Sequence, residues 1–216
     1  MSSTTPTPST QADTVPTATG PAGWRFETKQ VQAGHDPKAD NTRARAIPIY
    51  QTTSYVFDSA QQAADRFSLS DLGPIYTRLT NPTNEIVENR IAALEGGVGA
   101  LLTASGLGAE TLTFLTLGQA GSNIVASPSL YGGTTNLLTR TLPKYGIQTR
   151  FVTDPADPAS WAAQADEHTI AFFGESIPNP KNDILDIEPV AATAHEIGIP
   201  LVVDNTVASP YLTRPI

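Results

Sequence analysis

The groups best suited to chemistry in this sequence follow short apolar runs. Asp204 comes directly after Leu201-Val202-Val203, a run typical of a strand buried on both faces of a parallel sheet. Ser105-Gly106-Leu107 follows the apolar residues 100–102 and precedes a helical stretch. Such a turn lets the free N–H groups of a helix start, together with the helix dipole, bind a phosphate. The alternatives are that Asp204 caps a following turn and that the glycine marks an ordinary strand-to-helix turn.

Aromatic, amide and cationic side chains occur at comparable places. Tyr131 follows another apolar run, beside Gly132-Gly133, where its ring could stack on a flat ligand. Asn179 lies after the apolar run 170–173 and offers an amide. Tyr76 and Arg78 supply a phenol and a permanent cation, which are both good phosphate donors. Taken singly, such residues are more often a turn aromatic, a loop asparagine and a solvated surface charge.

Together these groups predict a phosphate cradle, an aromatic platform and a buried carboxylate. Ligands of open α/β sheets bind at the carboxyl ends of the strands, and a set of this kind at that edge suits a planar phosphorylated heterocycle with a basic nitrogen. Pyridoxal 5'-phosphate is such a molecule. A carboxylate beside its pyridine nitrogen would shift the nitrogen pKa by ~1–3 units toward the charged form. The protonated ring is the electron sink that carbanion chemistry at an amino acid requires.

The elements that must position these groups alternate along the chain. Apolar runs that predict strands are separated by stretches that predict helices, which is typical of an α/β fold with a doubly wound, mostly parallel sheet. The expected strands lie at 100–102, 124–126, 151–152, 170–173 and 201–204. The expected helices are 106–117, a stretch after Gly133 bounded by Pro143 and Gly146, a helix around Trp161, and 189–197.

The part of the chain before this alternation differs in character. Residues 1–20 are rich in Ser, Thr and Pro and predict a disordered tail. Residues 21–75 predict an arm for subunit contacts, irregular from Trp24 to Phe57 and followed by one short helix at 59–67. The remainder, 76–216, predicts the front part of a cofactor-binding α/β domain. Its first helix starts at Pro82 behind the capping residue Asn81 and stops at Gly96-Gly97.

Composition narrows the function classes. The chain has 216 residues, a net charge of −8 and no cysteine. The negative charge disfavours nucleic acid and anionic membrane as partners, and the absence of cysteine excludes disulfides and thiolate chemistry. The three histidines lie far apart, so no metal site is expected. No window approaches the about 18 apolar residues of a membrane span and no signal peptide is visible, so we expect a cytoplasmic protein.

Five segments, in this order and spacing, resemble the Cys/Met-metabolism family of pyridoxal-phosphate-dependent enzymes. They are Pro48-Ile49-Tyr50-Gln51-Thr52-Thr53-Ser54, Tyr76-Thr77-Arg78 with Asn81-Pro82-Thr83, Ala104-Ser105-Gly106, Leu130-Tyr131-Gly132-Gly133-Thr134 and Val202-Val203-Asp204-Asn205-Thr206. The resemblance runs from about Trp24 to Ile216. It implies the aspartate-aminotransferase-like fold (fold type I) of pyridoxal-phosphate-dependent transferases.

The resemblance also assigns roles to residues. Gly106 and Leu107 would give backbone N–H groups to the cofactor phosphate, although the family more often has Gln or Met at the position of Leu107. Tyr131 would stack on the ring and Asp204 would bind its nitrogen, and these two are the expected catalytic residues. Tyr76 and Arg78 would reach the phosphate of a neighbouring subunit. The remaining expected cofactor contacts are Ser105, Asn179 and Thr206.

Within the family the chain is most similar to the O-acetylhomoserine sulfhydrylase branch. The similarity lies in segments 43–46, 175–183 and 204–210. It implies a γ-replacement in which O-acetylhomoserine and sulfide give homocysteine and acetate, in a homo-oligomer, a dimer of dimers, with sites shared between subunits. The alternatives are cystathionine γ-synthase and a methionine or cystathionine γ-lyase, whose branches usually have Phe where Val207 stands.

The family's Schiff-base lysine lies in a Ser-x-Thr-Lys segment downstream of the Asp-Asn-Thr strand. The lysines of this chain are Lys29, Lys38, Lys144 and Lys181, and none stands in such a segment. Lys181 follows Asn179-Pro180 in a segment that resembles one of the family's own loops. We therefore do not expect Lys181 to be the Schiff-base lysine. The sequence therefore predicts the N-terminal portion of such an enzyme, with a non-catalytic remnant as the remaining alternative.

Overall fold

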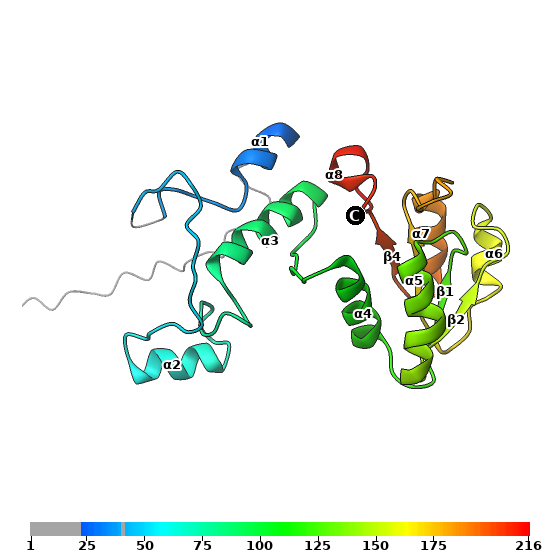
Figure 1. The fold of residues 1–216 in the computed structure, drawn as a ribbon, viewed down its shortest axis with the longest axis horizontal. Helices are drawn as coiled ribbons and strands as arrows, with labels where there is room; N and C mark the ends of the chain where they lie inside the picture. The colour runs from blue at the N-terminus through cyan, green and yellow to red at the C-terminus, as the bar shows by residue number, and fades with distance from the viewer. Residues whose placement is uncertain (1–22, 40–41) are drawn as a thin grey trace, which may run out of the picture. The chain divides into compact units, whose positions relative to one another are not determined.

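The computed structural model describes residues 23–39 and 42–216 (Figure 1). The expected disordered tail, 1–20, lies outside the described residues. The chain divides into two compact units, one up to Ala100 and the other from Leu101 to Ile216. Each is described by itself. The expectation that residues 21–75 form an arm for subunit contacts stays a prediction.

In its described residues the first unit contains three helices, α1 (Phe26–Gln32), α2 (Ala60–Phe67) and α3 (Pro82–Glu95). The two predicted from the sequence, α2 and α3, are confirmed, and so is the predicted cap of α3, Asn81. The Ser59 side chain accepts a hydrogen bond from Gln62 N, and the Asn81 side chain accepts one from Thr83 N. Gly96 ends α3 in the left-handed conformation, with φ 84°. Helix α1 was not predicted, because it has no buried residue and so no apolar periodicity.

Helix α1 is held by the first unit's longest helix. Arg90 Nε of α3 donates a hydrogen bond to Ala33 O, at 2.8 Å, and Lys29 Nζ of α1 donates one to Ala93 O, at 3.3 Å. Both contacts join residues more than fifty positions apart in the sequence. The seven-residue helix therefore depends on tertiary contacts that local sequence does not encode.

The second unit is built on a four-stranded parallel sheet in the order β2-β1-β3-β4 (Figure 1). The strands are β1 (Asn123–Ala126), β2 (Gln148–Phe151), β3 (Thr169–Glu175) and β4 (Leu201–Asp204). The helices are α4 (Gly106–Leu117), α5 (Gly132–Asn136), α6 (Pro158–Ala162), α7 (Ile187–Glu196) and α8 (Ser209–Leu212). Helix α5 continues as a π-helical turn (Leu137–Thr141) and a 3-10 turn (Leu142–Tyr145). The predicted α/β class with a parallel, doubly wound sheet is confirmed. None of the helices in the described ranges combines the length and apolarity needed to cross a membrane.

Apolar cores lie on both faces of the sheet, and neighbouring residues of β3 separate them. Phe173 packs edge-on against Phe114 of α4, with ring centroids 5.3 Å apart, in the core that α4 and α5 cover. Phe172 packs on the opposite face against Trp161 of α6, at 5.4 Å, in the core that α6 and α7 cover. Alternate side chains of a strand point to opposite faces, so the Phe172-Phe173 pair shows that β3 is covered on both sides.

Two expectations about strands were wrong. Residues 100–102 were expected to form a strand, but they are irregular and Leu101 is 74% exposed. A short apolar run becomes a strand only beside a neighbour that satisfies its backbone groups, and this segment is not part of the sheet. Leu201-Val202-Val203 was expected to be buried on both faces. All residues of β4 are only half-buried, because β4 is the edge strand.

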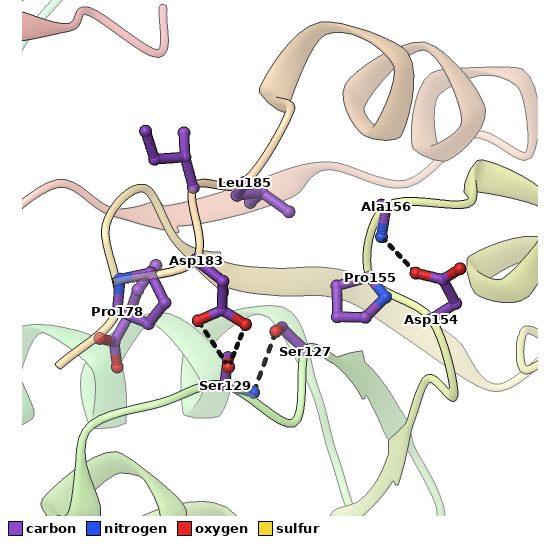
Figure 2. A pocket seen from close by; sticks show the side chains of 10 residues that line it. Ser127, Ser129, Asp154, Pro155, Ala156, Pro178, Asp183 and Leu185 are labelled. Carbon is purple, nitrogen blue, oxygen red and sulfur yellow. Dashed lines mark hydrogen bonds between the residues drawn. The ribbon is translucent and has the colours of Figure 1, made fainter. Parts of the chain in front are cut away.

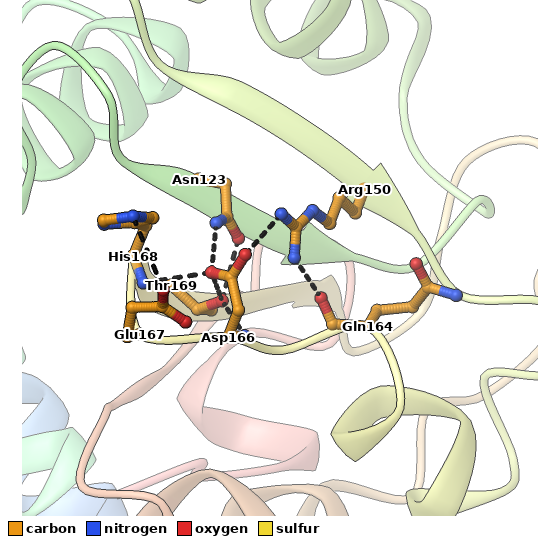
Figure 3. Close-up of polar contacts among 7 residues, drawn as sticks. All are labelled: Asn123, Arg150, Gln164, Asp166, Glu167, His168 and Thr169. Atoms are coloured by element: carbon orange, nitrogen blue, oxygen red, sulfur yellow. Dashed lines mark hydrogen bonds and ion pairs between the residues drawn. The ribbon is translucent and has the colours of Figure 1, made fainter.

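A polar network joins the first three strands near their amino ends (Figure 3). Asn123 Nδ2 donates to Asp166 Oδ1 at 2.7 Å, and Thr169 Oγ1 donates to Asn123 Oδ1 at 2.8 Å. Arg150 of β2 pairs with the other oxygen of Asp166 at 2.5 Å and also donates to Gln164 O. The hydrogen bond from Asn123, followed by that from Arg150, holds the pKa of Asp166 well below its usual range.

The contact between α4 and the sheet yields a stability prediction. Phe114→Ala removes a ring that is 0% exposed, and such a truncation costs about 3–5 kcal/mol of unfolding free energy. Thr116→Ala changes an exposed residue of the same helix and is expected to stay within about 0.5 kcal/mol. Urea unfolding followed by circular dichroism measures both. Equal losses for the two variants would mean that the Phe114–Phe173 contact does not anchor α4.

The polar network yields a pH prediction. The pKa of Asp166 is lower in the folded than in the unfolded protein, so its stabilising contribution is full above the unfolded pKa of about 4 and is lost as the pH falls. Asp166→Asn is therefore expected to unfold at lower urea than the unchanged protein at pH 7, with a gap that narrows toward pH 3. The matched control is Glu167→Gln, since that neighbouring side chain is 81% exposed. A gap that is as wide at pH 3 as at pH 7 would contradict the assignment.

Candidate functional site

Most of the predicted site residues converge on the carboxyl edge of the sheet. Tyr131 follows β1, Asn179 follows β3, and Asp204 ends β4. The strands are parallel, so their carboxyl ends share one edge. The start of α4, at Ser105, belongs to the same unit. This is the edge at which open α/β sheets bind ligands.

The register of β3 and β4 places two carboxyl groups beside each other. Glu175 is paired with Asp204, and Phe173 is paired with Val202. Phe173 and Val202 belong to the core beneath α4 and α5. Because the side-chain period of a strand is two residues, Glu175 and Asp204 continue that row on the same face. On the facing helix, Glu110 lies one turn before Phe114 and therefore faces the next position along this row.

The Asp204 carboxylate is half-buried, and one of its oxygens has local partners. Asp204 Oδ1 accepts hydrogen bonds from Thr206 N, at 2.9 Å, and from Thr206 Oγ1. The turn-capping alternative therefore describes this oxygen correctly. These two hydrogen bonds also hold the side chain in place, and the second carboxylate oxygen can accept from another donor. Binding of a ring nitrogen by Asp204 stays a prediction, as does a cofactor contact from Thr206.

Glu110 is an acid that no sequence pattern singled out. Its side chain is only 8% exposed, and Oε1 accepts a hydrogen bond from Thr134 Oγ1 at 3.0 Å. Its other oxygen, Oε2, is buried without a partner at normal hydrogen-bond geometry among the described residues. Burial raises the pKa of Glu110 to about 7 against the opposing effect of the Thr134 hydrogen bond, and the charges of Asp204 and Glu175 add to the rise.

Glu175 was also missed, although it ends β3, whose residues are almost all buried. Its Oε1 accepts a hydrogen bond from Tyr131 N and its Oε2 accepts one from Asn179 N, at 3.2 Å. One buried carboxyl thus holds the starts of two loops that carry predicted site residues. Burial raises its pKa, and these two backbone hydrogen bonds oppose the rise. A charged residue at the end of a buried run was the available signal in the sequence.

The ring of Tyr131 lies close to the backbone of Gly133. A Cβ added at Gly133 would lie 2.5 Å from Tyr131 Cε1 and 3.0 Å from Leu107 Cδ1. The tyrosine ring therefore occupies space that any larger residue at position 133 would take, and it lies near the first turn of α4. Tyr131 remains 48% exposed, so one side of its environment is open to a ligand. Stacking of Tyr131 on a cofactor ring stays a prediction.

The start of α4 is open and polar. Ser105 Oγ accepts a hydrogen bond from Gly108 N at 3.1 Å, and Ser105 O accepts one from Ala109 N. The N–H groups of Gly106 and Leu107 precede these and have no partner inside the helix. A Cβ added at Gly106 would meet nothing within 4 Å. This 12-residue helix therefore presents free donors and its positive dipole end to open space, an arrangement that fits a phosphate.

Tyr76 and Arg78 lie in the first unit, so their relation to this edge stays a prediction. They are brought together with each other, since the Arg78 guanidinium lies 5.9 Å from the centre of the Tyr76 ring. Tyr76 forms an isolated antiparallel bridge with Ser54, and Thr77 N donates to Thr53 O at 2.9 Å. The extended segment 47–57, predicted from the sequence, thus holds the phenol and the cation in place.

A pocket of about 170 Å³ opens at the same carboxyl edge (Figure 2). It is lined by segments that follow β1, β2 and β3, including Ser127, Asp154 and Glu175. On its wall Ser129 Oγ lies 2.7 and 2.9 Å from the two carboxylate oxygens of Asp183. This contact lowers the pKa of Asp183. The pocket therefore adds polar, acidic surface beside the predicted cofactor edge.

The residues present fit pyridoxal phosphate in kind. Open helix N–H groups suit its phosphate, an exposed tyrosine ring suits its flat face, and the half-buried carboxylate of Asp204 suits its ring nitrogen. Three carboxyls gather on one face of the sheet, so a positively charged group placed there would relieve their mutual repulsion.

Comparison with known proteins agrees with this chemistry. Residues 27–216 match the model of the family described as Cys/Met metabolism PLP-dependent enzyme. The O-acetyl-L-homoserine sulfhydrylase of Corynebacterium glutamicum is 53% identical over 193 residues, which cover 89% of this chain and 44% of the relative. The enzyme of the same name from Leptospira meyeri is 51% identical, over 91% of this chain and 44% of its own length.

A solved structure shares the fold. It is the crystal structure of a putative O-acetylhomoserine (thiol)-lyase from Campylobacter jejuni, which carries an N'-pyridoxyl-lysine-5'-monophosphate. It has a TM-score of 0.85 and 38% identity, covering 89% of this chain and 47% of that one. The chain thus spans about half the length of the relatives it matches. These findings confirm the resemblance drawn from the five sequence segments: the chain belongs to the Cys/Met-metabolism family of pyridoxal-phosphate-dependent enzymes.

Proposed function

We propose that the chain is the N-terminal portion of an O-acetyl-L-homoserine sulfhydrylase, which converts O-acetylhomoserine and sulfide to homocysteine and acetate. The observation that carries this proposal is the identity of 53% to a relative of that name across 89% of the chain, over the stretch that builds the site. The activity serves methionine biosynthesis, and the cytoplasm is its proposed location.

In this function the carboxyl edge of the second unit binds the cofactor. Gly106 and Leu107 donate backbone N–H groups to the phosphate, beside Ser105. The Tyr131 ring covers one face of the cofactor, and Asn179 presents its amide from the loop that Glu175 holds. When bound, pyridoxal phosphate supplies an electron sink for negative charge at the substrate α-carbon.

Asp204 determines how strongly the cofactor ring withdraws electrons. Its Oδ1 is held by Thr206, and its other oxygen would accept a hydrogen bond from the protonated ring nitrogen. An opposite charge at contact distance raises the pKa of such a nitrogen by about 1–3 units, so it keeps its proton at neutral pH. The proposal requires that a lysine outside residues 1–216 binds the cofactor and moves the substrate proton. Lys181 follows the predicted site residue Asn179 by two positions, and it is exposed.

The role of Asp204 yields a prediction for the complete enzyme. Asp204→Asn keeps the shape of the side chain but removes its charge, and a loss of ~3 kcal/mol of transition-state stabilisation lowers kcat more than a hundredfold. Asp186→Asn changes an exposed aspartate without a capping contact and is expected to leave kcat unchanged. Homocysteine formation from O-acetylhomoserine and sulfide is the measurement. Near-normal turnover of Asp204→Asn would mean that the carboxylate only caps its turn.

The sulfur donor distinguishes the proposal from the other branches of the family. The sulfhydrylase is expected to use sulfide in preference to cysteine, and to release no α-keto acid from methionine or cystathionine. Initial rates with each substrate on the same preparation measure this. A higher kcat/KM with cysteine would assign the chain to cystathionine γ-synthase. Inactivity of a correctly folded, cofactor-loaded protein with every substrate would favour a non-catalytic remnant.

Tyr76 and Arg78 are proposed to act across a subunit boundary, in a homo-oligomer whose dimers share their sites. Arg78→Ala and Asp204→Asn are each expected to be inactive alone. A mixed dimer would combine Arg78 from one subunit with Asp204 from the other, and co-refolding in equal amounts would restore about a quarter of the activity. Activity and subunit exchange are measured on the same sample. If mixed dimers form and restore nothing, Arg78 serves its own chain or lies outside the site.

A further inference from the structure

We propose that Glu110 is a positioning residue whose carboxylic acid donates a hydrogen bond to Asp204 and thereby fixes that carboxylate toward the ring nitrogen of the cofactor. The inference rests on the proposed function for the role of Asp204, and it adds a residue that neither the motifs nor the family resemblance selected. Glu110 acts through Asp204 and not on the substrate.

The geometry places Glu110 at the inner side of the site. It projects from α4 one turn before Phe114, whose ring packs on Phe173 of the sheet. The strand positions that follow Phe173 and Val202 on this face are Glu175 and Asp204. The side chain of Glu110 is thus enclosed between α4 and the carboxyl ends of β3 and β4, with 8% of its surface exposed.

The hydrogen bonds determine which oxygen would carry a proton. Thr134 Oγ1 of α5 donates to Glu110 Oε1, so Oε1 is an acceptor. Oε2 is buried without a partner at normal hydrogen-bond geometry in the described structure. Asp204 is near enough for its charge to raise the pKa of Glu110. A proton on Oε2 would let Glu110 donate to the Asp204 carboxylate and would give the buried oxygen a partner.

The charges around Glu110 favour the protonated form. The titratable groups that act on it are Asp204 of β4 and Glu175 of β3, and α5 contributes the uncharged Thr134. Both titratable groups are acids, and burial raises the pKa of Glu110 to about 7. Glu175 already accepts two backbone hydrogen bonds. Glu110 has a buried oxygen without such a partner among the described residues, and its raised pKa keeps a substantial share of its side chains protonated at neutral pH.

In this arrangement the Asp204 carboxylate would accept a hydrogen bond from Glu110, a donor that packing holds in one orientation. Thr206 holds Oδ1 from the solvent side, and Glu110 would hold the carboxylate from the protein interior. A carboxylate with both supports has one orientation in which to meet the ring nitrogen. A hydrogen bond to a charged group contributes about 1.5–3 kcal/mol, which corresponds to a tenfold or larger change in an equilibrium constant.

Two substitutions separate this role from a structural one. Glu110→Gln keeps the acceptor for Thr134 and supplies a permanent donor toward Asp204, so it mimics the protonated acid. Glu110→Leu fills similar space without either function. The dissociation constant for pyridoxal phosphate, measured by fluorescence titration, is expected to change less than threefold in Glu110→Gln and to rise tenfold or more in Glu110→Leu. Equal weakening in both variants would overturn the proposal, because it would show that the charge of Glu110 is what matters.

A second measurement needs no cofactor and remains decisive if Glu110→Leu fails to fold. The pKa of Glu110 is raised in the folded protein, so its stabilising contribution is full below the unfolded pKa of about 4.5 and is lost as the pH rises to about 7. The thermal midpoint is expected to fall by several degrees between pH 5 and pH 7.5 relative to that of Glu110→Gln. Glu196→Gln, an exposed glutamate of α7, is the matched control and is expected to follow the unchanged protein. A constant difference between the unchanged protein and Glu110→Gln over this range would overturn the proposal.

The same titrations distinguish failure of this inference from failure of the proposed function. If Asp204→Asn binds pyridoxal phosphate as tightly as the unchanged protein and turns over normally, the proposed function of Asp204 is wrong. If Asp204→Asn weakens cofactor binding while Glu110→Leu, folded, binds normally, Asp204 keeps its role and the role proposed for Glu110 is wrong.

Discussion

The candidate site depends on the parallel register between β3 and β4. That register pairs Glu175 with Asp204 and sets both carboxyls on the face that α4 and α5 cover. A slip of one residue would turn every side chain of one strand to the other face. Asp204 would then leave the neighbourhood of Glu110, and the core residue Val202 would leave the contact with Phe173. The apolar register that forms the core thus also aligns the acids.

Gathering three carboxyls at one place is costly, and the structure offsets the cost differently for each. Glu175 receives two backbone hydrogen bonds, from Tyr131 and Asn179. Asp204 is only half-buried and receives two hydrogen bonds from Thr206. Glu110 is buried and has one oxygen without a partner among the described residues, and a retained proton is the remaining way to avoid a buried, uncompensated charge.

Local patterns in the sequence predicted where strands end and where helices begin. Apolar runs identified β1, β3 and β4, and with them the positions of Tyr131, Asn179 and Asp204. Glu110 could not be recognised in this way, because its environment arises only when α4 packs on the sheet. Glu175 stands at the end of an apolar run, but its pairing with Asp204 arises only when β3 pairs with β4. The absence of a strand at residues 100–102 has the same origin, since an apolar run alone does not specify a neighbour.

The two ends of the sheet show opposite electrostatics, and the difference points to the ligand. At the amino ends Asp166 is satisfied by Asn123 and Arg150 of its own unit, and its pKa falls. At the carboxyl ends the charged groups that act on Glu110 are acids only, and its pKa rises. The acid at the amino end is thus paired within the chain, whereas the acids around Glu110 raise its pKa instead of pairing with it. If Asp204 binds the ring nitrogen of the cofactor as proposed, the proton on that nitrogen would place a positive charge beside these acids and reduce their mutual repulsion.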